Sequence, residues 1–357
     1  MRGFLSFVLL LSLRTLVVSA TFLICGTETY AEQNSAVDFA LGIGSSRDDV
    51  LVRDLLVDGH GGMFLAGDFS GSINLGEEGE SVTIHSQGEY DAFILRIGAD
   101  GVLDWVETFG GEGIDRIEGM ALDNEGGVAV SGYFIGPFEF AVDTEWEVSS
   151  EGGHRPFVLR LEDSGDLRWA VVFDAYSDMD ISNMVVGDKG GLLCTGSFKG
   201  EIDFDPGPGY EISVSEFFAP QPSNGSDDSF LLKLDEVGQF EWVQTIGSYW
   251  TDAGKDVELD EDGNIYVLAE VRGTIDMDPG EGVHFLGSGV AEPVNTIPRS
   301  RSVLQKLDSE GNFVWAEFLG GETANGMALD SSGYLYVSGT FRGEQDFGSS
   351  DLKVHLT

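Results

Sequence analysis

The sequence has little cysteine, proline or positive charge. Its 357 residues include 2 cysteines, 9 prolines and 19 lysines and arginines, against 62 aspartates and glutamates. The formal charge of −43 repels phosphate backbones and anionic membrane surfaces, which excludes nucleic acid as a partner. The sequence also contains no phosphate-binding glycine loop, Ser/His/Asp arrangement or paired-cysteine metal motif. The acidic excess has two interpretations, which are solubility in a saline habitat and binding of divalent cations.

Residues 1–31 have the pattern of a secretory signal peptide. Arg2 precedes a long apolar stretch, and a small-residue cleavage pattern ends at Ala31, with an earlier alternative at Ala20. We therefore expect cleavage near Ala31 and a mature protein that is secreted, periplasmic or on the cell surface.

An uncleaved membrane anchor is the alternative, because the segment from Phe4 to Cys25 is long enough to span a bilayer. Arg14 would then lie near the membrane centre, at a cost of about 2.5 to 3.5 kcal/mol. Cleavage is favoured, which leaves the mature protein without a membrane attachment and with Cys194 as its one cysteine. No intramolecular disulfide can then form.

Four tryptophans mark an internal repeat. They are separated by 64, 73 and 73 residues, and each lies four positions after a glycine. An apolar run containing one basic residue begins twelve positions before each tryptophan. We expect these bases to lie on an exposed strand face, where they offset nearby carboxylates. The tryptophans are Trp105, Trp169, Trp242 and Trp315, the glycines Gly101, Gly165, Gly238 and Gly311, and the bases Arg96, Arg160, Lys233 and Lys306.

Each tryptophan is followed by another strand-like run, a glycine turn and a strand with small residues at fixed intervals. Five copies of this last strand occur, at residues 67–71, 132–136, 196–200, 269–273 and 339–343. Each repeat thus supplies about four strands, and its connections are too short for crossover helices, so the strands must be antiparallel. Such units repeated around an axis are the blades of a β-propeller, in which stacking of blades excludes water from the apolar faces.

We therefore predict an all-β chain with a single β-propeller domain at residues 32–357. Its blades fall at about 45–110, 111–174, 175–247, 248–321 and 322–357, the last completed by residues 35–44. Residues 37–44 match the tryptophan-containing strand, with Phe39 in the tryptophan position. Pairing of this N-terminal strand with the C-terminal strands would close the ring without free sheet edges. No counterpart of the run at Phe93 follows Thr357, so either the sequence is a fragment or the fifth blade has three strands.

These motifs resemble the SBBP-type β-propeller repeats, a bacterial family distantly similar to WD repeats. The resemblance covers residues 37–357 and implies a secreted or surface propeller, but no particular ligand or reaction. The family name implies seven blades, whereas about five repeats are present. The likeness rests on residues 91–97, the spacing of Gly101 and Trp105, Gly110-Gly111 followed by Asp115, the turn at 123–126 and the Gly-x-Phe-x-Gly strand.

Aligned positions on the innermost strands are candidates for an axial site. A glycoside hydrolase or lyase would use Asp54, Glu118 or Asp256, as a pair of carboxylates with opposed pKa shifts. Three acids among 62 do not by themselves indicate catalysis, so we expect no enzyme activity. The axial candidates are Asp54, Glu118, Asn183, Asp256 and Asn325.

Two Asp-x-Asp-Pro-Gly loops offer a candidate metal site. Asp203 with Asp205, and Asp276 with Asp278, place hard oxygen ligands for calcium two residues apart. The favoured interpretation is turn formation, because aspartate side chains bond neighbouring amides and the ligand spacing of an EF-hand is missing. No resident cofactor is expected, with calcium as the alternative.

Cys194 is expected to be a small buried hydrophobe, because the same strand position elsewhere holds leucine or valine. The sequence thus predicts a monomeric, exported binding or scaffold propeller, whose loops and channel mouth contact a protein or carbohydrate ligand. The alternatives are the hydrolase or lyase and a structural surface protein with calcium in its acidic loops.

Overall fold

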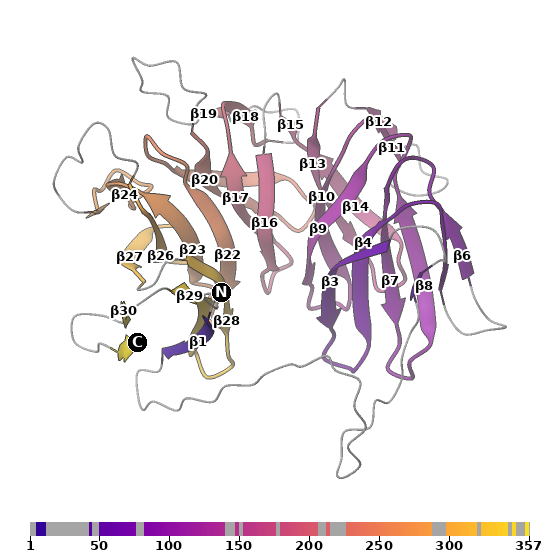
Figure 1. Ribbon diagram of the computed structural model, residues 1–357, viewed down its shortest axis with the longest axis horizontal. Helices are drawn as coiled ribbons and strands as arrows, with labels where there is room; N and C mark the ends of the chain where they lie inside the picture. Colours follow the sequence, from indigo (N-terminus) through magenta and orange to yellow (C-terminus); the bar gives the residue numbers. More distant parts are fainter. Residues whose placement is uncertain are drawn as a thin grey trace, which may run out of the picture.

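The computed structural model contains only β-structure among the residues that it describes (Figure 1). No helix long and apolar enough to cross a membrane occurs in those residues. The described residues are 5–11, 43–44, 50–75, 82–139, 147–149, 153–175, 179–205, 212–214, 226–287, 298–319, 323–341, 345–347 and 354–356.

The strands form four four-stranded antiparallel sheets, which confirms the predicted repeating unit. In each sheet the strands follow chain order, because every connection is a short turn or an outward loop. The first sheet contains β3 (Val50–Val57), β4 (Met63–Phe69), β7 (Asp91–Ile97) and β8 (Leu103–Phe109), and the second contains β9 (Asp115–Leu122), β10 (Val128–Phe134), β13 (Arg155–Leu161) and β14 (Leu167–Val172). The third contains β16 (Met179–Val186), β17 (Leu192–Phe198), β20 (Asp228–Leu234) and β21 (Phe240–Ile246), and the fourth contains β22 (Ala253–Leu259), β23 (Ile265–Arg272), β26 (Ser300–Leu307) and β27 (Phe313–Phe318).

Smaller sheets are formed by the excursions between the second and third strands of the large sheets, by segments beside the termini, and by β15, which connects the second and third large sheets. They are β2 (Ile43–Gly44) with β5 (Ser72–Leu75) and β6 (Val82–His85), β11 (Pro137–Glu139) with β12 (Glu147–Ser149), β15 (Asp174–Ala175) with β18 (Glu201–Asp203) and β19 (Ile212–Val214), β24 (Ile275–Asp276) with β25 (Phe285–Leu286), and β30 (Gln345–Phe347) with β31 (Val354–Leu356).

A fifth sheet contains β28 (Thr323–Leu329), β29 (Leu335–Phe341) and β1 (Leu5–Leu11). Strand β1 pairs with β29 in the place that the third strand takes in the other sheets, and Phe7 lies opposite Gly339. Phe93 lies opposite Gly67 in the same register in the first sheet. The N-terminal apolar segment therefore occupies a strand position that the sequence analysis left empty.

The closing strand predicted at residues 35–44 is described only at Ile43–Gly44. These residues pair with Leu75 and Asn74 of β5, in the excursion of the first sheet. Phe39 lies outside the described residues. The described part of this segment thus joins the small sheet of β5 and β6, and its predicted pairing with the C-terminal strands is not seen among the described residues.

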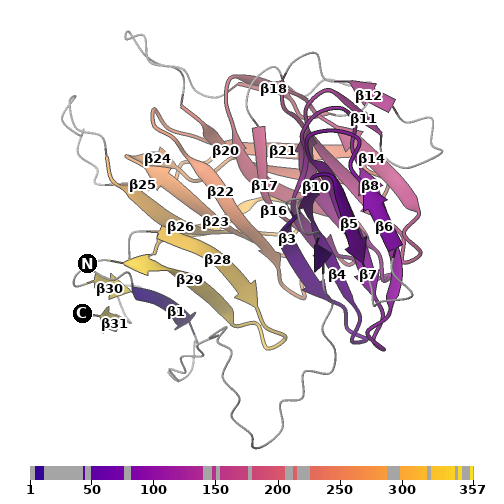
Figure 2. The ribbon, with the colours of Figure 1, turned by 45° about the vertical axis from the view of Figure 1, so that its right-hand side comes forward.

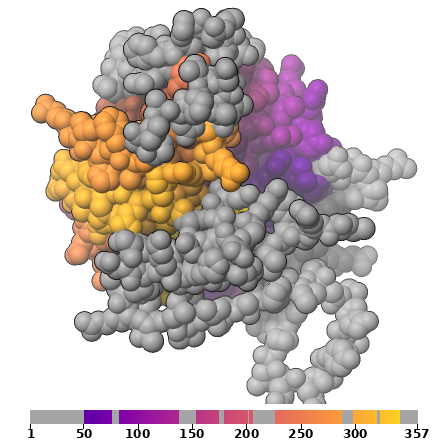
Figure 3. Space-filling model, turned by 60° about the vertical axis from the view of Figure 1, so that its left-hand side comes forward, coloured from indigo at the N-terminus to yellow at the C-terminus, as the bar shows by residue number. Residues whose placement is uncertain are grey.

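The first strand of each large sheet lies innermost, and these strands contact one another in the order β3, β9, β16, β22 and β28. The sheets fan outward from them as an arc (Figure 2). In the space-filling view, the fourth and fifth sheets, in orange and yellow, form one continuous mass (Figure 3). The predicted closed ring is not seen among the described residues.

The inner strand of the first sheet carries apolar side chains that its counterparts bury. Val52 of β3 is 52% exposed, whereas Ile117 and Ile181 at the same register position are 1% and 2% exposed. Leu55 is 49% exposed, against 7% for Met120. In the second to fifth sheets this face packs against the preceding sheet, so β3 presents a face that has no such neighbour among the described residues.

The repeated tryptophan and glycine are contacts between neighbouring sheets. The indole N–H of Trp105 donates a 2.9 Å hydrogen bond to Asp163 O, in the last turn of the second sheet. A Cβ added at Gly165 would lie 3.0 Å from the Trp105 ring. Gly238 and Gly311 make the same contact with Trp169 and Trp242, so each of these glycines meets the tryptophan of the preceding sheet.

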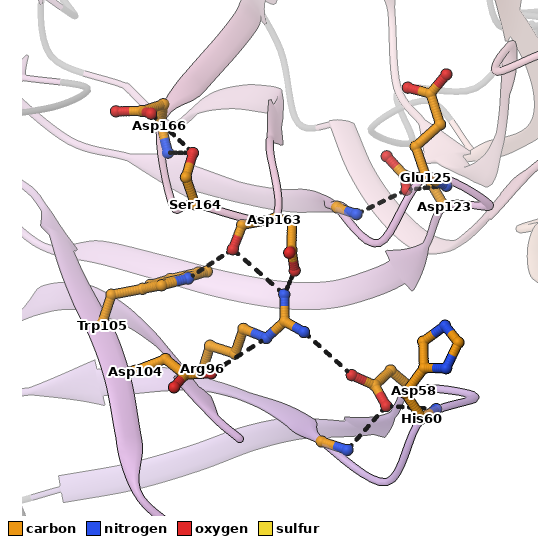
Figure 4. A network of polar contacts seen from close by, with 12 residues as sticks. Asp58, His60, Arg96, Asp104, Trp105, Asp123, Glu125, Asp163, Ser164 and Asp166 are labelled. Carbon is orange, nitrogen blue, oxygen red and sulfur yellow. Dashed lines mark hydrogen bonds and ion pairs between the residues drawn. The ribbon is translucent and has the colours of Figure 1, made fainter. Parts of the chain in front are cut away.

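The recurring bases are buried or half-buried, so the prediction of an exposed strand face is wrong. Arg96 and Arg160 link neighbouring sheets, whereas Lys233 and Lys306 pair with Glu241 and Asp260 of their own sheets. Arg160 is 2% exposed, and its guanidinium donates to Asp123 Oδ2 at 2.8 Å and to Gly190 O of the third sheet at 2.6 Å. Arg96 makes the matching contacts with Asp58 and with the Asp163 carbonyl (Figure 4). The reason is geometric, because alternation places these bases on the face that meets the next sheet.

Candidate functional site

All five inner strands bulge at the same point, where one residue is left out of the pairing with the second strand. Bulges re-aim side chains and are common next to functional sites. The structure places the predicted axial residues at or beside these bulges. The bulged residues are Arg53, Glu118, Ser182, Lys255 and Asn325, and the residues that follow them are Asp54, Gly119, Asn183, Asp256 and Gly326.

Asp54 and Asp256 use both carboxylate oxygens to hold the main chain. Asp54 Oδ1 accepts from Leu55 N at 2.8 Å, and Oδ2 accepts from Met120 N of the next inner strand at 2.8 Å. Asp256 repeats the arrangement, with its Oδ2 accepting from Met327 N at 2.5 Å. Burial raises the pKa of Asp256 to about 6, and the two amides oppose the shift. These contacts join neighbouring inner strands.

Glu118 is an exposed residue at the bulge of β9. Desolvation by the surrounding protein raises its pKa to about 7, and the negative charge of Asp180 adds to this shift. The positive charge of Arg53 opposes it. Glu118 can therefore exchange a proton near neutral pH.

The axial residues do not form one described carboxylate pair. Glu118 interacts with Asp180 and Arg53, whereas Asp256 interacts with the main chain and with Glu258. Asn183 is half-buried on the third sheet and Asn325 is exposed on the fifth. Within the described chain, no group of three or more His, Cys, Asp or Glu side chains could hold a metal ion.

A cluster of arginine and tyrosine lies where the first and second sheets meet. Asp68, which is fully buried, accepts from Arg53 Nε at 2.5 Å and lies 3.8 Å from Arg116 Nε. Arg116 Nη1 donates to Tyr133 Oη at 3.2 Å. About a third of each arginine side chain is exposed, at 34% for Arg53 and 32% for Arg116.

Two aromatic rings complete the cluster. The guanidinium of Arg116 lies 5.7 Å from the centre of the Tyr90 ring, in cation–π geometry. The exposed ring of His154 stacks on Tyr133, with centroids 4.6 Å apart and an angle of 18°. We call Arg53, Asp68, Tyr90, Arg116, Tyr133 and His154 the Arg–Tyr cluster.

Sequence reasoning missed this cluster because its members come from six separate segments of two repeats. One signal was present, since Arg53 and Arg116 are two of only 19 basic residues and lie on equivalent inner strands. Nothing local in the sequence places Asp68 between them. That contact requires β4 to pair beside β3, and β3 to pack beside β9.

The Asp-x-Asp-Pro-Gly loops hold their own main chain. Asp203 Oδ1 accepts from Asp205 N at 3.1 Å, and Asp276 Oδ1 accepts from Asp278 N at 3.2 Å. Asp276 Oδ1 also accepts from His284 N at 2.7 Å. These are the side-chain to amide hydrogen bonds expected of the turn interpretation.

No protein-family model and no curated protein matches this chain. Among solved structures, the Dos1 propeller is 8% identical in sequence, with a TM-score of 0.28 over 82% of this chain and 94% of that chain. The extracellular domain of the hybrid two-component system BT4673 from B. thetaiotaomicron is 11% identical, with a TM-score of 0.17 over 87% of this chain and 49% of that chain. TM-scores this low support no inference about the function of this chain.

Proposed function

We propose that this protein is an exported, non-catalytic binding module that recognises a polypeptide or carbohydrate ligand through the Arg–Tyr cluster. One observation carries the proposal. Two arginines, each about one third exposed, are held by one buried aspartate and flanked by tyrosines in a chain of formal charge −43. Arginine and tyrosine dominate the energy of binding interfaces, because both combine large contact area with directed hydrogen bonds.

Preorganisation of the cluster favours binding. Asp68 holds Arg53 through two hydrogen bonds, and Tyr133 holds Arg116 through one. A ligand that meets these side chains therefore does not have to order them, which lowers the entropy cost of association. The resemblance to SBBP-type repeats and the signal-peptide pattern of residues 1–31 support export of the protein. Cleavage near Ala31 would remove β1 and leave the edge of β29 without this partner.

The test combines an unbiased pull-down from the native medium with a glycan array, using the purified protein. We expect a ligand that the wild type binds and that Arg116→Ala and Tyr133→Ala bind at least tenfold more weakly. Arg168→Ala, which removes an exposed base paired with Glu125 on the second sheet, is the matched control. A glycan that binds should be recovered without cleavage, because the proposed module is non-catalytic. Empty results from both screens, or equal binding by the cluster variants, would overturn the proposal.

We further propose that the fifth sheet packs on the open face of β3 and completes a five-bladed ring. Apolar side chains that neighbouring sheets bury elsewhere are exposed on β3, and a second sheet is what covers this face in the other repeats. Ala328 and Ser338 at the other end of the arc are also exposed. Alanine and serine occupy the matching positions of the second sheet, at Ala121 and Ser131, where they are buried.

Cysteine cross-linking tests this ring. Gly326 has the register position from which Asp256 reaches the next inner strand, and a Cβ there would make only ordinary contacts. In a Cys25→Ser background, Leu55→Cys with Gly326→Cys should form an intrachain disulfide, detected by its mobility without reductant. Leu55→Cys with Gly119→Cys is the specificity control. Gly119 has the same register position on the inner strand of the second sheet, so this pair should not form a disulfide. Failure of the first pair to cross-link under oxidation would argue against a five-bladed ring.

A further inference from the structure

The outer edge of β29, the second strand of the fifth sheet, pairs with the N-terminal strand β1 (Figure 2). The pairing covers seven residues, from Leu5 opposite Phe341 to Leu11 opposite Leu335. The signal-peptide pattern of residues 1–31 predicts that this strand is removed on export. Removal would leave a row of unpaired amide and carbonyl groups on β29, which is the kind of edge to which a polypeptide adds a further strand.

Gly339 marks a place for an aromatic side chain on β29. In the first three large sheets, the second strand has a glycine at this register position, and the third strand has a buried phenylalanine opposite it. A Cβ at Gly132 would lie 2.8 Å from the ring of Phe157, so the absence of a side chain makes room for the ring. The three pairs are Gly67 with Phe93, Gly132 with Phe157 and Gly196 with Phe230.

The bulge of the first strand does not by itself account for this glycine. In the fourth sheet the same position is Ala269, which lies beside a bulge of the same kind and opposite Val303. Alanine is therefore compatible with the bulged neighbour where the third strand has a smaller side chain. The fifth sheet has Gly339 at this position, so it is suited to a strand with phenylalanine opposite that glycine.

A second feature of the fifth sheet is a hydrogen-bonded aspartate and tyrosine. In the fourth sheet, Lys306 of the third strand donates to Tyr266 Oη at 2.6 Å and to Asp260 Oδ2 at 3.3 Å. The fifth sheet repeats the two acceptors, with Tyr336 Oη donating to Asp330 Oδ2 at 2.8 Å. The fifth sheet thus has the groups that receive a base in the fourth.

The base and the aspartate occur together in the other sheets. Where the turn between the first and second strands begins with aspartate, the base of the third strand pairs with it. In the third sheet this turn begins with Gly187, and Lys233 pairs with Glu241 instead. The aspartate of the fifth sheet therefore predicts a base on the strand beside it. The pairs are Arg96 with Asp58, Arg160 with Asp123 and Lys306 with Asp260.

Strand β1 has no base at this position. Leu10 lies opposite Tyr336, at the register position that Lys306 takes opposite Tyr266. In the part of the chain that the structure describes, Asp330 accepts hydrogen bonds from its own turn and from Tyr336 but forms no ion pair. The strand on β29 thus has phenylalanine at the first of the two positions and leucine at the second.

We propose that the outer edge of β29 binds an extended strand of a partner polypeptide, with phenylalanine opposite Gly339 and lysine or arginine opposite Tyr336. The two side chains are three residues apart on that strand, as Phe93 and Arg96 are. Main-chain hydrogen bonds supply the affinity, and the two side-chain positions supply the specificity.

The partner is a different protein rather than a second copy. Within the described chain, the strands with this pattern lie between two neighbours in their own sheets, so a second copy has no free strand to donate. The inference rests on export in the proposed function, since β1 must be removed. It does not depend on the ligand of the Arg–Tyr cluster, which involves other side chains.

Peptide binding to the exported protein tests the inference. The chain is produced with its N-terminal segment in a secreting host, and N-terminal sequencing identifies the exported product. The probe is a fluorescent peptide with the sequence of residues 226–236, which has Phe230 and Lys233 at the required spacing. We expect saturable binding by fluorescence anisotropy. The full-length chain that retains residues 1–31 should not bind the peptide, because β1 covers the edge.

Matched changes in the two partners locate the bound peptide. Lys233→Leu in the peptide should weaken binding about tenfold, because it removes a charge-assisted hydrogen bond. Asp330→Asn in the protein should weaken binding of the unchanged peptide by a similar factor and leave binding of the Lys233→Leu peptide as it is. Phe230→Ala in the peptide should cost more than about tenfold. Asp308→Asn is the control, because Asp308 holds its own turn through the same two amide contacts as Asp330 and lies in the fourth sheet.

The outcomes separate this inference from the proposed function. A ligand screen that finds nothing for the Arg–Tyr cluster leaves the peptide titration unaffected. An exported protein that does not bind the peptide would overturn the inference, as would equal binding of the unchanged, Lys233→Leu and scrambled peptides. Retention of residues 1–31 after export would also overturn it, because β1 would keep the edge. The peptide variants remain decisive if Asp330→Asn fails to fold.

Discussion

Trp169 packs against Gly238 across the junction of the second and third sheets. The indole N–H donates a 3.1 Å hydrogen bond to Glu236 O, and a Cβ added at Gly238 would lie 2.9 Å from the ring. The same glycine has a φ of 80°, which other residues rarely adopt. One glycine therefore serves both the turn and the contact between sheets.

Alanine substitutions separate these two roles. Gly238→Ala should lower the free energy of unfolding by about 3 kcal/mol, from the left-handed backbone and the clash with Trp169 together. Gly333→Ala, at a φ of 79° with nothing within 4 Å, should lose only about 1 to 2 kcal/mol from the backbone. Urea unfolding measures both. Equal losses would show that the tryptophan contact does not hold the sheets together.

The repeat could be predicted from the sequence because its signal is periodic. Tryptophan and glycine recur at fixed spacing since each pair makes the same contact between sheets, and the strands between them keep their length. The order of strands in each sheet followed from the short connections. The completion of the fifth sheet could not be predicted in this way. It depends on which segment pairs with β29, and the apolar run of β1 resembles the apolar runs of the repeats.

The role of the recurring base could not be predicted, because it depends on a partner in the next repeat. Arg160 has an ordinary alternating position in β13, and the prediction placed it on an exposed face. In the structure it reaches Gly190 O of the third sheet, 30 residues away. The polar contact exists only after the sheets stack, and no local pattern encodes that distance.

The Arg160–Asp123 ion pair gives a second prediction. Both side chains are 2% exposed, so removal of one partner leaves an uncompensated buried charge. Arg160→Met should lower the free energy of unfolding by about 3 to 5 kcal/mol, and Arg160→Met with Asp123→Leu should recover part of the loss. Arg168→Met, which removes an exposed ion pair with Glu125, should cost less than about 1 kcal/mol. Losses of similar size in Arg160→Met and Arg168→Met would contradict the buried link.

Cys194 gives a third prediction. Its side chain is fully buried in β17, and burial raises the pKa of its thiol, which suppresses the reactive thiolate. In a Cys25→Ser background the native protein should not react with a thiol reagent until it unfolds. Cys194→Val should change stability by less than about 1.5 kcal/mol, because valine holds the same position at Val130. Cys194→Ser should cost about 1 to 3 kcal/mol by burying a hydroxyl. Rapid labelling of the native protein would refute the buried assignment.

Of the site, the sequence could place the axial candidates but not their partners. The alignment of repeats put Asp54, Glu118 and Asp256 on inner strands, where the structure finds the bulges. It could not show that Asp54 and Asp256 bind the next strand's amides, since those contacts cross 66 and 71 residues. Asp91 of β7 and Asp115 of β9 are buried residues of the motif that carries the family resemblance, and the charge of Asp91 acts on Asp115 only because the first and second sheets meet.

The inner strands make stability depend on pH, and Glu258 is the clearest group. Burial raises its pKa from 4.5 to about 7, and the charge of Asp256 adds to the shift. A raised carboxyl pKa means that the folded state holds the proton more tightly than the unfolded state. The contribution to stability is therefore full below about pH 4.5 and is lost as pH rises through about 7.

Glu258→Gln should leave stability unchanged near pH 4.5 and raise it by about 1 to 3 kcal/mol at pH 8. Urea unfolding of the wild type and this variant across that range, with the exposed Glu261→Gln as control, measures the difference. Parallel pH profiles for the wild type and Glu258→Gln would show that the group titrates alike in the folded and unfolded chains.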